Sequence, residues 1–372
     1  MVAVSVALLS QLRAVLDGEG PALALGMDER VVLPEGTGVA IRTSGSTGIL
    51  KTVLLSREAL VCAAQATADR IGHGRWLLAM SPSYVAGLGV LVRSILAGTE
   101  PVTLEPGPFT PEAFVAGARA LSGAGARYTS LVPTQLARLL AAAENDPSVR
   151  AAVQSFDTIL LGGQAMPVTL REGAAAIGAR VVRTYGSTET CGGCVYDGVP
   201  LRGVRVQVSA GGEVELAGGM LATGYLRDPQ RTAAAFHHDT EGTRWYRTGD
   251  AGAFSAGALR ITGRVDNVIV SGGVNVSLDR VEAVVQGVPG LAGAVVIAAA
   301  DETWGQTSVV FVDRAMLGSA DASERLAAAR QAVQEQVGVA ARPSRIIVQD
   351  GLPVLASGKP DRARLRALTQ LR

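Results

Sequence analysis

The stretch that decides the fold reads Thr43-Ser44-Gly45-Ser46-Thr47-Gly48-Ile49-Leu50-Lys51. The apolar residues 39–42 before it predict a short strand, and residues 52–55 after it predict a second one. Ser56 is a typical helix N-cap, and an alanine-rich helix pattern follows it. Because glycines let backbone N–H groups approach an anion while hydroxyls and a lysine add donors and charge, the stretch predicts a loop that binds a triphosphate. A flexible Gly/Ser linker is the alternative.

The composition indicates a globular protein with room for two domains. The chain has 372 residues, of which 48% are hydrophobic and 18% are charged, and this length allows a substantial core. Lys plus Arg total 34 and Asp plus Glu total 33, so no net field favours nucleic acid or an acidic partner. No apolar run reaches the roughly 20 residues of a membrane span, and the start lacks the basic region of a signal peptide. Three cysteines cannot form a disulfide framework, so we expect a cytoplasmic location.

Strand and helix patterns alternate between residues 39 and 184, which is typical of an α/β domain with a largely parallel sheet. The helix patterns cover residues 58–71, 88–96, 111–122, 133–144 and 167–177. From about residue 199 the pattern changes to short alternating segments around turn residues, which predicts antiparallel strands. A second small α/β unit begins near Arg264, with helices predicted at 277–287 and 321–337.

Two more polar segments follow predicted strands or turns. Tyr185-Gly186-Ser187-Thr188-Glu189-Thr190 comes directly after the strand predicted at 180–184, and ligands of open α/β sheets bind beyond the carboxyl ends of strands. An acidic residue at a phosphate loop indicates a Mg²⁺ ligand, because a hard cation prefers carboxylate and phosphate oxygen together. Tyr246-Arg247-Thr248-Gly249-Asp250 places a carboxylate at a turn, where a solvated aspartate or a cap is the alternative.

Five segments in this order resemble the motifs of the adenylate-forming superfamily, which contains acyl-CoA synthetases, luciferases and the adenylation domains of peptide synthetases. Three are the segments quoted above, and the other two are Gly263-Arg264-Val265-Asp266 with Val270-Ser271-Gly272-Gly273-Val274-Asn275-Val276, and Ser357-Gly358-Lys359-Pro360-Asp361. Together they span about residues 43 to 361. A narrower resemblance, carried by residues 86–94, 128–136 and 191–201, is to the short actinobacterial-type o-succinylbenzoate–CoA ligases of menaquinone biosynthesis.

The resemblance implies an α/β fold in two domains. Residues 1–263 would form a large N-terminal domain with a mostly parallel sheet and a small β-barrel-like subdomain, and residues 264–372 a small mobile α+β C-terminal domain. Most of the N-terminal subdomain of longer relatives would be lacking. The implied reaction joins o-succinylbenzoate to coenzyme A (CoA) through an acyl-adenylate, with ATP and Mg²⁺ taking part and AMP and diphosphate released.

Two other functions stay open at this stage. One is a different adenylating enzyme, such as a ligase for an aryl or short acyl acid or a carrier-protein loader, which ATP–pyrophosphate exchange across a panel of acids would separate. The other is a catalytically inactive binding homologue, against which the joint presence of Lys359, Glu189 and Asp250 argues. The expected partners are the small-molecule acid, ATP and CoA, with no nucleic acid and no membrane, and the sequence leaves a homodimer open.

The resemblance also implies roles for individual residues of an ATP site. The phosphate loop would hold the β- and γ-phosphates through Thr43, Ser44, Gly45, Ser46, Thr47, Gly48 and Lys51. The residues implied for adenine, the α-phosphate and Mg²⁺ are Tyr185, Gly186, Thr188 and Glu189. Asp250 would accept hydrogen bonds from the ribose hydroxyls, and Arg264 would support the ribose or a phosphate. The implied catalytic residues are Lys359, which would bridge the carboxylate and the α-phosphate, with Thr188 and Glu189.

Such chemistry needs positioning and charge neutralisation rather than a covalent protein nucleophile, because a carboxylate and a triphosphate repel each other. Lys359 and Mg²⁺ would supply the positive charge. One site cannot easily hold pyrophosphate-facing and thiol-facing groups at once, so the hypothesis is that the C-terminal domain rotates about the hinge residue Asp266. The rotation would withdraw Lys359 and present the loop Ser271-Gly272-Gly273 to CoA.

The acid of the family carries a second carboxylate, and Arg93 is the basic residue that we expect against it; a surface or structural ion pair is the alternative. Weaker candidates for the acid pocket are Ser130, Thr134, Gly162, Gly163 and Gly186. Tyr84 stands where many relatives have histidine, and tyrosine donates a hydrogen bond without becoming cationic. Asn267 and Leu278 likewise stand where an acid and a proline are commoner.

The remaining polar residues favour structural roles. Cys191-Gly192-Gly193-Cys194 has the spacing of a zinc or redox motif, but the sequence holds no second cysteine pair, so we expect this segment to shape a pocket wall. The His237-His238 pair lies in a polar segment and is predicted to be solvated. Trp304 is predicted to anchor packing in the small domain.

Overall fold

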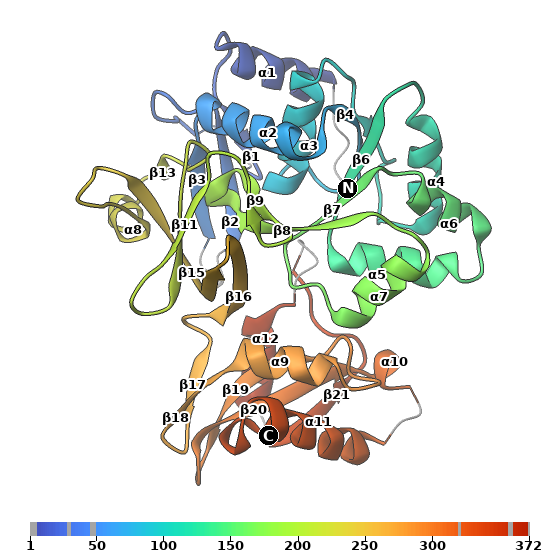
Figure 1. Ribbon diagram of the computed structural model, residues 1–372, viewed down its shortest axis with the longest axis vertical. Helices are drawn as coiled ribbons and strands as arrows, with labels where there is room; N and C mark the ends of the chain where they lie inside the picture. Colours follow the sequence, from blue (N-terminus) through green and yellow to red (C-terminus); the bar gives the residue numbers. More distant parts are fainter. Residues whose placement is uncertain (1–5, 28–30, 45–49, 319–320, 356–359, 371–372) are drawn as a thin grey trace.

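The computed structural model describes residues 6–27, 31–44, 50–318, 321–355 and 360–370. Figure 1 shows a larger upper body and a smaller lower body. The last strand of the upper body is β16 (Ala258–Arg264), and the first strand of the lower body is β17 (Val268–Ser271). The mixed α/β architecture predicted from the sequence is confirmed. The domain boundary at 263/264 stays a prediction.

A seven-stranded sheet crosses the upper body in the order β10-β9-β8-β7-β6-β4-β5. Its parallel strands are β5 (Val102–Thr103), β4 (Gly74–Leu78), β6 (Ala126–Leu131), β7 (Thr158–Leu161) and β8 (Val181–Ser187). Antiparallel to β8 run β9 (Gly192–Tyr196) and then β10 (Val199–Pro200). The largely parallel sheet expected from the alternating pattern is therefore present, and its carboxyl ends meet at one edge.

Helices cover both faces of this sheet, which explains why its strands are apolar on both sides. On one face, α2 (Arg57–Ile71) and α3 (Val85–Leu96) pack with Trp76 and Leu78. On the other face, Leu77 packs with α4 (Pro111–Ala120), α5 (Pro133–Ala143), α6 (Pro147–Gln154) and α7 (Val168–Ala176). The helix α6 was not predicted from the sequence. It is a two-turn helix that begins at Pro147 behind the N-cap Asp146.

The glycine-rich stretch joins the two strands of a β-hairpin. The strands β2 (Val39–Ser44) and β3 (Leu50–Leu55) pair antiparallel, with Thr43 opposite Lys51. Both predicted strands are confirmed, and Ser56 caps α2 by accepting a 3.1 Å hydrogen bond from the backbone N–H of Ala59. The hairpin is flanked by β1 (Leu23–Leu25), on which α1 (Val6–Asp17) packs, and by β13 (Gly224–Tyr225).

A five-stranded antiparallel sheet forms the part that was expected to be β-barrel-like. Its order is β11 (Arg205–Val208), β12 (Glu213–Ala217), β15 (Arg244–Ser255) and β14 (Phe236–His238), with β16 also paired to β15. The register of β15 against β16 shifts between Ala251 and Gly252, next to the predicted ribose ligand Asp250. The short helix α8 (Pro229–Ala235) connects β13 to β14.

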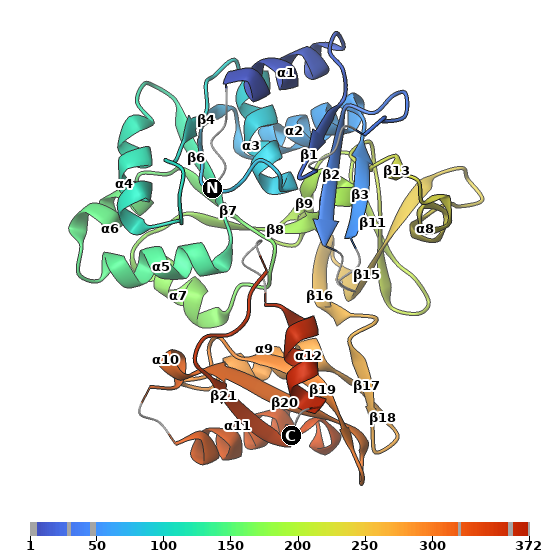
Figure 2. The same cartoon turned by 180° about the vertical axis from the view of Figure 1, so that it is seen from behind.

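The lower body is a second α+β unit, as expected. Its sheet has the order β18 (Val274–Ser277), β17, β20 (Gly305–Asp313) and β19 (Val295–Asp301), with β21 (Arg345–Gln349) parallel to β20. One face packs against α9 (Leu278–Gln286) and α11 (Ala322–Gln336), and the other face against α12 (Arg362–Gln370), as Figure 2 shows. The short helix α10 (Arg314–Leu317) follows β20.

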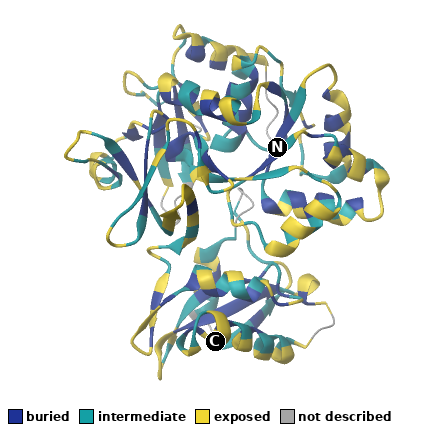
Figure 3. Ribbon diagram, in the orientation of Figure 1, coloured by how far each residue is buried: buried dark blue, intermediate teal, exposed yellow. Residues whose placement is uncertain are grey.

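Buried residues concentrate on the strands and on the inner faces of the helices in both bodies (Figure 3). In the upper body the largest fully buried side chains include Trp76, Tyr196, Phe114 and Phe156. In the lower body Phe311 and the valines of β20 fill the space between the sheet and its helices. Each body thus contains its own apolar core, which is the hallmark of a separate domain.

Candidate active site

The phosphate loop is described only at its two stems. Thr43 is the last residue of β2 whose side chain is described. Its Oγ1 is buried without a hydrogen-bond partner among the described residues. Lys51 lies opposite Thr43 on β3. Of the other predicted loop residues, the side chain of Ser44 and all of Gly45, Ser46, Thr47 and Gly48 lie outside the described part of the chain, and so does Lys359.

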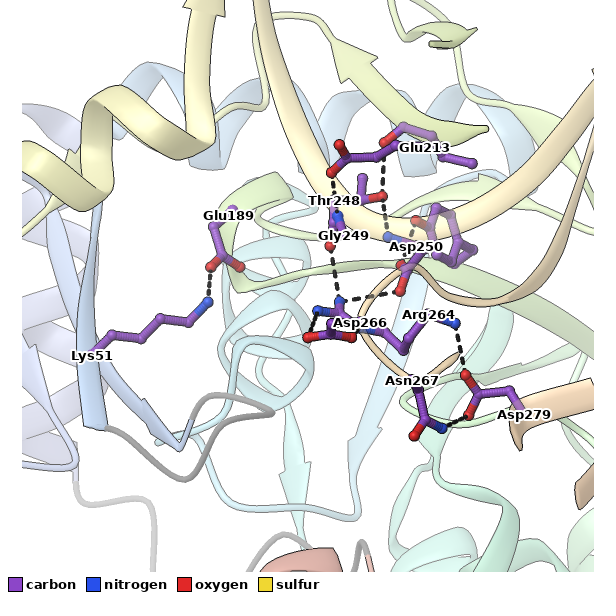
Figure 4. A network of polar contacts seen from close by, with 12 residues as sticks. Lys51, Glu189, Glu213, Thr248, Gly249, Asp250, Arg264, Asp266, Asn267 and Asp279 are labelled. Carbon is purple, nitrogen blue, oxygen red and sulfur yellow. Dashed lines mark hydrogen bonds and ion pairs between the residues drawn. The ribbon is translucent and has the colours of Figure 1, made fainter. Parts of the chain in front are cut away.

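Glu189 lies in the first turn after β8, in the single 3₁₀ turn Thr188–Thr190, and it is buried to 2% exposure. Its Oε1 forms an ion pair with the Lys51 ammonium and accepts a 2.8 Å hydrogen bond from the Tyr225 hydroxyl (Figure 4 shows the contact with Lys51). Burial alone would raise the pKa of Glu189, but Lys51 and Tyr225 outweigh burial and lower this pKa below its usual value. The carboxylate is therefore ionised at neutral pH, at the base of the phosphate loop.

Asp250 is the centre of a second group of polar contacts. Its Oδ2 accepts a 2.7 Å hydrogen bond from the Tyr185 hydroxyl. Its Oδ1 lies 3.2 Å from Nη1 of Arg264 (Figure 4). Burial raises the pKa of Asp250, although Tyr185 and Arg264 act against it. The structure thus brings together three residues that the sequence assigned to the adenosine end of ATP.

Glycines at two positions let neighbouring atoms come close to the backbone around Tyr185, Asp250 and Arg264. A Cβ on Gly249, whose φ is +71°, would lie 2.7 Å from Nη2 of Arg264. A Cβ on Gly186 would lie 2.0 Å from the carbonyl oxygen of Gly192 on the neighbouring strand β9. The contact at Gly186 is with backbone and cannot be relieved by a side-chain movement. At Gly249 the Arg264 side chain could move, but the positive φ still favours glycine.

Arg264 also connects the two bodies. Its Nε and Nη2 donate to the two carboxylate oxygens of Asp266 at 2.9 and 3.1 Å, and its backbone N–H donates to Asp279 of α9 at 2.7 Å. The second oxygen of Asp279 accepts a 2.8 Å hydrogen bond from the Asn267 amide. This explains the departure at position 267, because an acid there would face a carboxylate where the amide now donates.

We expect Asn267→Asp to lower the free energy of unfolding by about 1–2 kcal/mol, because it exchanges a hydrogen bond for a pair of like charges. Adding Asp279→Asn should restore most of the loss, since the exchanged pair can form the same contact in reverse. Differential scanning calorimetry of the single and double variants measures both effects. A double variant as unstable as the sum of its two single variants would contradict the contact.

The Arg93 guanidinium has no carboxylate partner among the described residues. It stacks over Trp76 at 4.2 Å from the ring centroid, and its Nη2 donates to Ser130 at 3.4 Å. Its Nε is buried without a hydrogen-bond partner in this part of the chain, and burial lowers the pKa of Arg93. The alternative, a structural ion pair, therefore finds no carboxylate partner among the described residues.

The other predicted acid-site residues are only partly gathered around Arg93. Ser130 lies near the carboxyl end of β6, and the adjacent Gly162 donates its N–H to Leu131 at 3.2 Å. Gly163 follows with φ of +85°, as the turn after β7. Thr134 is exposed, and Tyr84 is the N-cap of α3 without a side-chain capping bond. Among the described contacts, none joins Tyr84 to Arg93.

The predicted CoA-side loop lies in the lower body, between β17 and β18. Ser271 is buried and pairs with Gly305, whereas Gly272 and Gly273 have positive φ values of 56° and 80°. A Cβ on Gly272 would lie 2.5 Å from the Trp304 ring, so Trp304 packs on this turn. Trp304 is nevertheless 39% exposed and lies outside the apolar core of the lower body, so it covers this turn and does not anchor the core.

Three features of the site differ from the sequence prediction or were missed by it. Asp250 was expected at a turn, but it lies within the strand β15 and pairs with Arg264 of β16. The prediction for His237 was wrong: it is not a freely solvated residue, because the β14–β15 pairing places its Nε2 3.7 Å from the buried carboxylate of Glu215. Tyr225 was not predicted at all. Its contact with Glu189 depends on the pairing of β13 with β3, two segments about 170 residues apart, which no local pattern signals.

The three cysteines are free thiols, and they lie near one another around α2 and β9. Burial raises the pKa of Cys62 and Cys191 and raises that of Cys194 to about 12. Within the described ranges, no cluster of three or more histidine, cysteine or acidic side chains could hold a metal ion.

The Lys51–Glu189 pair and the aspartate held by Tyr185 and Arg264 agree with the motif pattern of adenylate-forming enzymes of the acid–thiol ligase class. The chain belongs to the AMP-binding enzyme family: the description "AMP-binding enzyme" matches residues 14–226, and "AMP-binding enzyme C-terminal domain" matches residues 280–359. The family supports binding of ATP and of a small-molecule acid. None of the described helices is long and apolar enough to cross a membrane.

Individual relatives extend this comparison. A "Probable 2-succinylbenzoate--CoA ligase" of Mycobacterium tuberculosis is 39% identical over 375 residues, which cover 96% of this chain and 94% of that protein. The 2-succinylbenzoate--CoA ligase of Escherichia coli is 33% identical over 73% of this chain, which spans 57% of its length. The solved structure of o-succinylbenzoate CoA synthetase (MenE) from Bacillus subtilis, in complex with the acyl-adenylate intermediate OSB-AMP, matches with a TM-score of 0.75 at 26% identity, over 88% of this chain and 69% of that one.

Proposed function

We propose that the protein is an o-succinylbenzoate–CoA ligase of menaquinone biosynthesis. The observation that carries this proposal is the 39% identity, over nearly the full length of both chains, to a relative with that name. In the first half-reaction, a carboxylate oxygen of the acid attacks the α-phosphorus of ATP and diphosphate leaves. In the second, the CoA sulfur attacks the acyl carbon of the adenylate and AMP leaves.

The nucleotide roles come from the motif resemblance, and the contacts of the described residues Lys51, Tyr185, Asp250 and Arg264 support them. Lys51 and the hydroxyls of Thr43, Ser44, Ser46 and Thr47 would hold the outer phosphates, with Thr188 at the α-phosphate. The Asp250 carboxylate, fixed from two sides by Tyr185 and Arg264, would accept from the ribose hydroxyls. A carboxylate already held by two donors keeps its orientation, which reduces the entropy lost on binding.

Glu189 fits the role of a Mg²⁺ ligand. Mg²⁺ in nucleotide sites is held by one or two carboxylates together with phosphate oxygens, so a single buried carboxylate beside the phosphate loop is sufficient. The lowered pKa keeps Glu189 ionised for this role. When bound, the ion supplies positive charge that offsets the repulsion between acid and triphosphate.

Arg93 is the group that we assign to the second carboxylate of the acid. It is a cation with no counter-ion among the residues that the structure describes, stacked on Trp76 and hydrogen-bonded to Ser130. A dicarboxylic acid would bring the missing negative charge, and a monocarboxylic acid would not. Lys359 would carry its ammonium group to the other carboxylate, the one that reacts.

The hinge proposal predicts a split between the half-reactions. Asp266→Pro fixes φ at this position and removes an N–H, so it should slow thioester formation while leaving adenylate formation intact. ATP–pyrophosphate exchange and single-turnover transfer from preformed adenylate to CoA measure the two steps. Asp266→Ala, which loses the ion pair with Arg264 but keeps the backbone free, is the control. Equal losses in both steps of the proline variant would contradict the hinge.

The finer assignments belong to the same proposal. CoA is the acyl acceptor, and the enzyme acts in the cytoplasm. Light scattering, which measures the molar mass in solution, tests for a homodimer. The decisive experiment supplies ATP, Mg²⁺, CoA and o-succinylbenzoate and detects AMP together with the aromatic thioester. A panel that includes benzoate, as the monocarboxylic control, tests the acid. Equal turnover of benzoate would favour the alternative, a ligase for other aryl or acyl acids.

A further inference from the structure

The geometry points to Tyr225 as a positioning residue of the nucleotide site. Its hydroxyl holds the Glu189 carboxylate, and its ring holds the Lys51 ammonium. This inference rests on the roles proposed above for Glu189 and Lys51. It adds a third residue, from a strand outside all of the motif segments.

Strand pairing brings Tyr225 to this place. β13 pairs antiparallel with β3, and Tyr225 lies opposite Val53. Lys51 lies two residues before Val53, so its side chain is a diagonal neighbour of Tyr225 on the same face of the sheet. Lys51 Nζ lies 5.1 Å from the centroid of the Tyr225 ring, which is within the range of a cation–π contact.

The hydroxyl of Tyr225 acts on the carboxylate. It donates to Oε1 of Glu189 at 2.8 Å, the same oxygen that contacts Lys51. An ionised carboxylate can only accept, so the Tyr225 hydroxyl serves it as the donor. When Lys51 turns to a phosphate, Tyr225 still holds Oε1 and keeps the carboxylate in a fixed orientation.

Tyr225 is itself held firmly. Its backbone N–H donates to Thr232 Oγ1 at 3.0 Å, and the next residue, Leu226, donates its N–H to the Thr52 carbonyl at 2.9 Å. The residue is 7% exposed, with Phe236 packed at 6.1 Å between ring centroids. Because hydrogen bonds hold its backbone and packing holds its ring, Tyr225 can orient Glu189 and Lys51 with little loss of side-chain entropy.

The test separates the hydroxyl from the ring. Tyr225→Phe should raise the Mg²⁺ concentration for half-maximal adenylate formation about 10-fold, the usual scale for loss of a hydrogen bond to a metal ligand. Calorimetric titration with ATP in EDTA should give an affinity unchanged within about twofold, because the ring over Lys51 is kept. Tyr225→Leu should weaken ATP binding in EDTA as well, by about threefold.

Tyr128→Phe is the matched control, because it removes the hydroxyl of an equally buried tyrosine whose hydrogen bond goes to the Ile71 carbonyl. The inference is overturned if Tyr225→Phe and Tyr128→Phe require the same Mg²⁺ concentration.

Glu189→Gln distinguishes failure of the proposed metal role of Glu189 from failure of the positioning role of Tyr225. If it leaves the Mg²⁺ requirement unchanged, the proposed metal role fails and that of Tyr225 fails with it; if it raises the requirement and Tyr225→Phe does not, the role of Tyr225 alone fails. Should Tyr225→Leu not fold, Tyr225→Phe decides.

Discussion

Replacing Glu189 by glutamine is expected to slow adenylate formation by about 10²- to 10³-fold, the scale of losing one preorganised electrostatic contact in an active site. The amide keeps the shape of the side chain and an oxygen for the Tyr225 hydroxyl, so the fold should survive. It removes the negative charge that balances Lys51 and that would bind the metal. The variant therefore loses charge and little else.

ATP–pyrophosphate exchange, measured over a range of Mg²⁺ concentrations, is the direct assay of this variant. Glu215→Gln is a suitable control, because Glu215 is equally buried and paired, with Arg247 at 3.4 Å, but lies on the five-stranded sheet away from the phosphate loop. Thermal midpoints of both variants show whether folding is affected. Full exchange activity in Glu189→Gln, at the wild-type Mg²⁺ requirement, would remove Glu189 from the site.

Replacing Arg93 by leucine is expected to lower kcat/KM for o-succinylbenzoate by about 30- to 5 × 10³-fold, which corresponds to the roughly 2–5 kcal/mol lost when one partner of a buried charge pair is removed. The reason is the missing counter-ion: the guanidinium has Trp76 and Ser130 as neighbours but no carboxylate among the described residues. The substrate would otherwise supply that carboxylate. Without Arg93, its second charge would enter a half-buried apolar site unbalanced.

Stability should change in the opposite direction to activity in this variant. An uncompensated cation between α3 and the sheet costs free energy in the folded protein, so leucine should keep or raise the thermal midpoint. Arg93→Lys keeps the charge but loses the planar stack on Trp76, and should fall between wild type and leucine in kcat/KM.

Arg127→Leu is the control for Arg93. It removes another guanidinium stacked on an aromatic ring, that of Phe156 at 5.5 Å, from the other face of the same sheet. This control should leave the KM for the acid unchanged. A wild-type KM for o-succinylbenzoate in Arg93→Leu would assign the second carboxylate to another residue.

Local patterns predicted most of the fold, because strands and helices in this chain are defined by nearby residues. The run before Thr43 and the run after Lys51 are apolar and short, and Ser56 has the side chain of a helix cap, so hairpin and helix could both be read directly. The motif resemblance likewise implied nucleotide roles for Glu189, Asp250 and Arg264, and the structure joins Asp250 to Arg264.

Contacts between distant segments could not be predicted in this way. Tyr225 reaches Glu189 only because β13 pairs with β3, and Asn267 meets Asp279 only because α9 starts beside the segment after β16. The short helix α6 carries too few residues for a clear period. Only two of the 34 basic residues are lysines, Lys51 and Lys359, and the rest are arginines. Lysine at these two positions favours functions that need its compact ammonium group and not a guanidinium.

The cysteines, two buried and one half-buried, have a practical consequence for measuring this enzyme. Reagents such as aromatic disulfides react with thiolates, and raised pKa values leave Cys62, Cys191 and Cys194 with little thiolate at neutral pH. Free CoA, in contrast, carries a solvent-exposed thiol. Its consumption can therefore be followed by colour in real time, with a protein background that develops slowly by comparison.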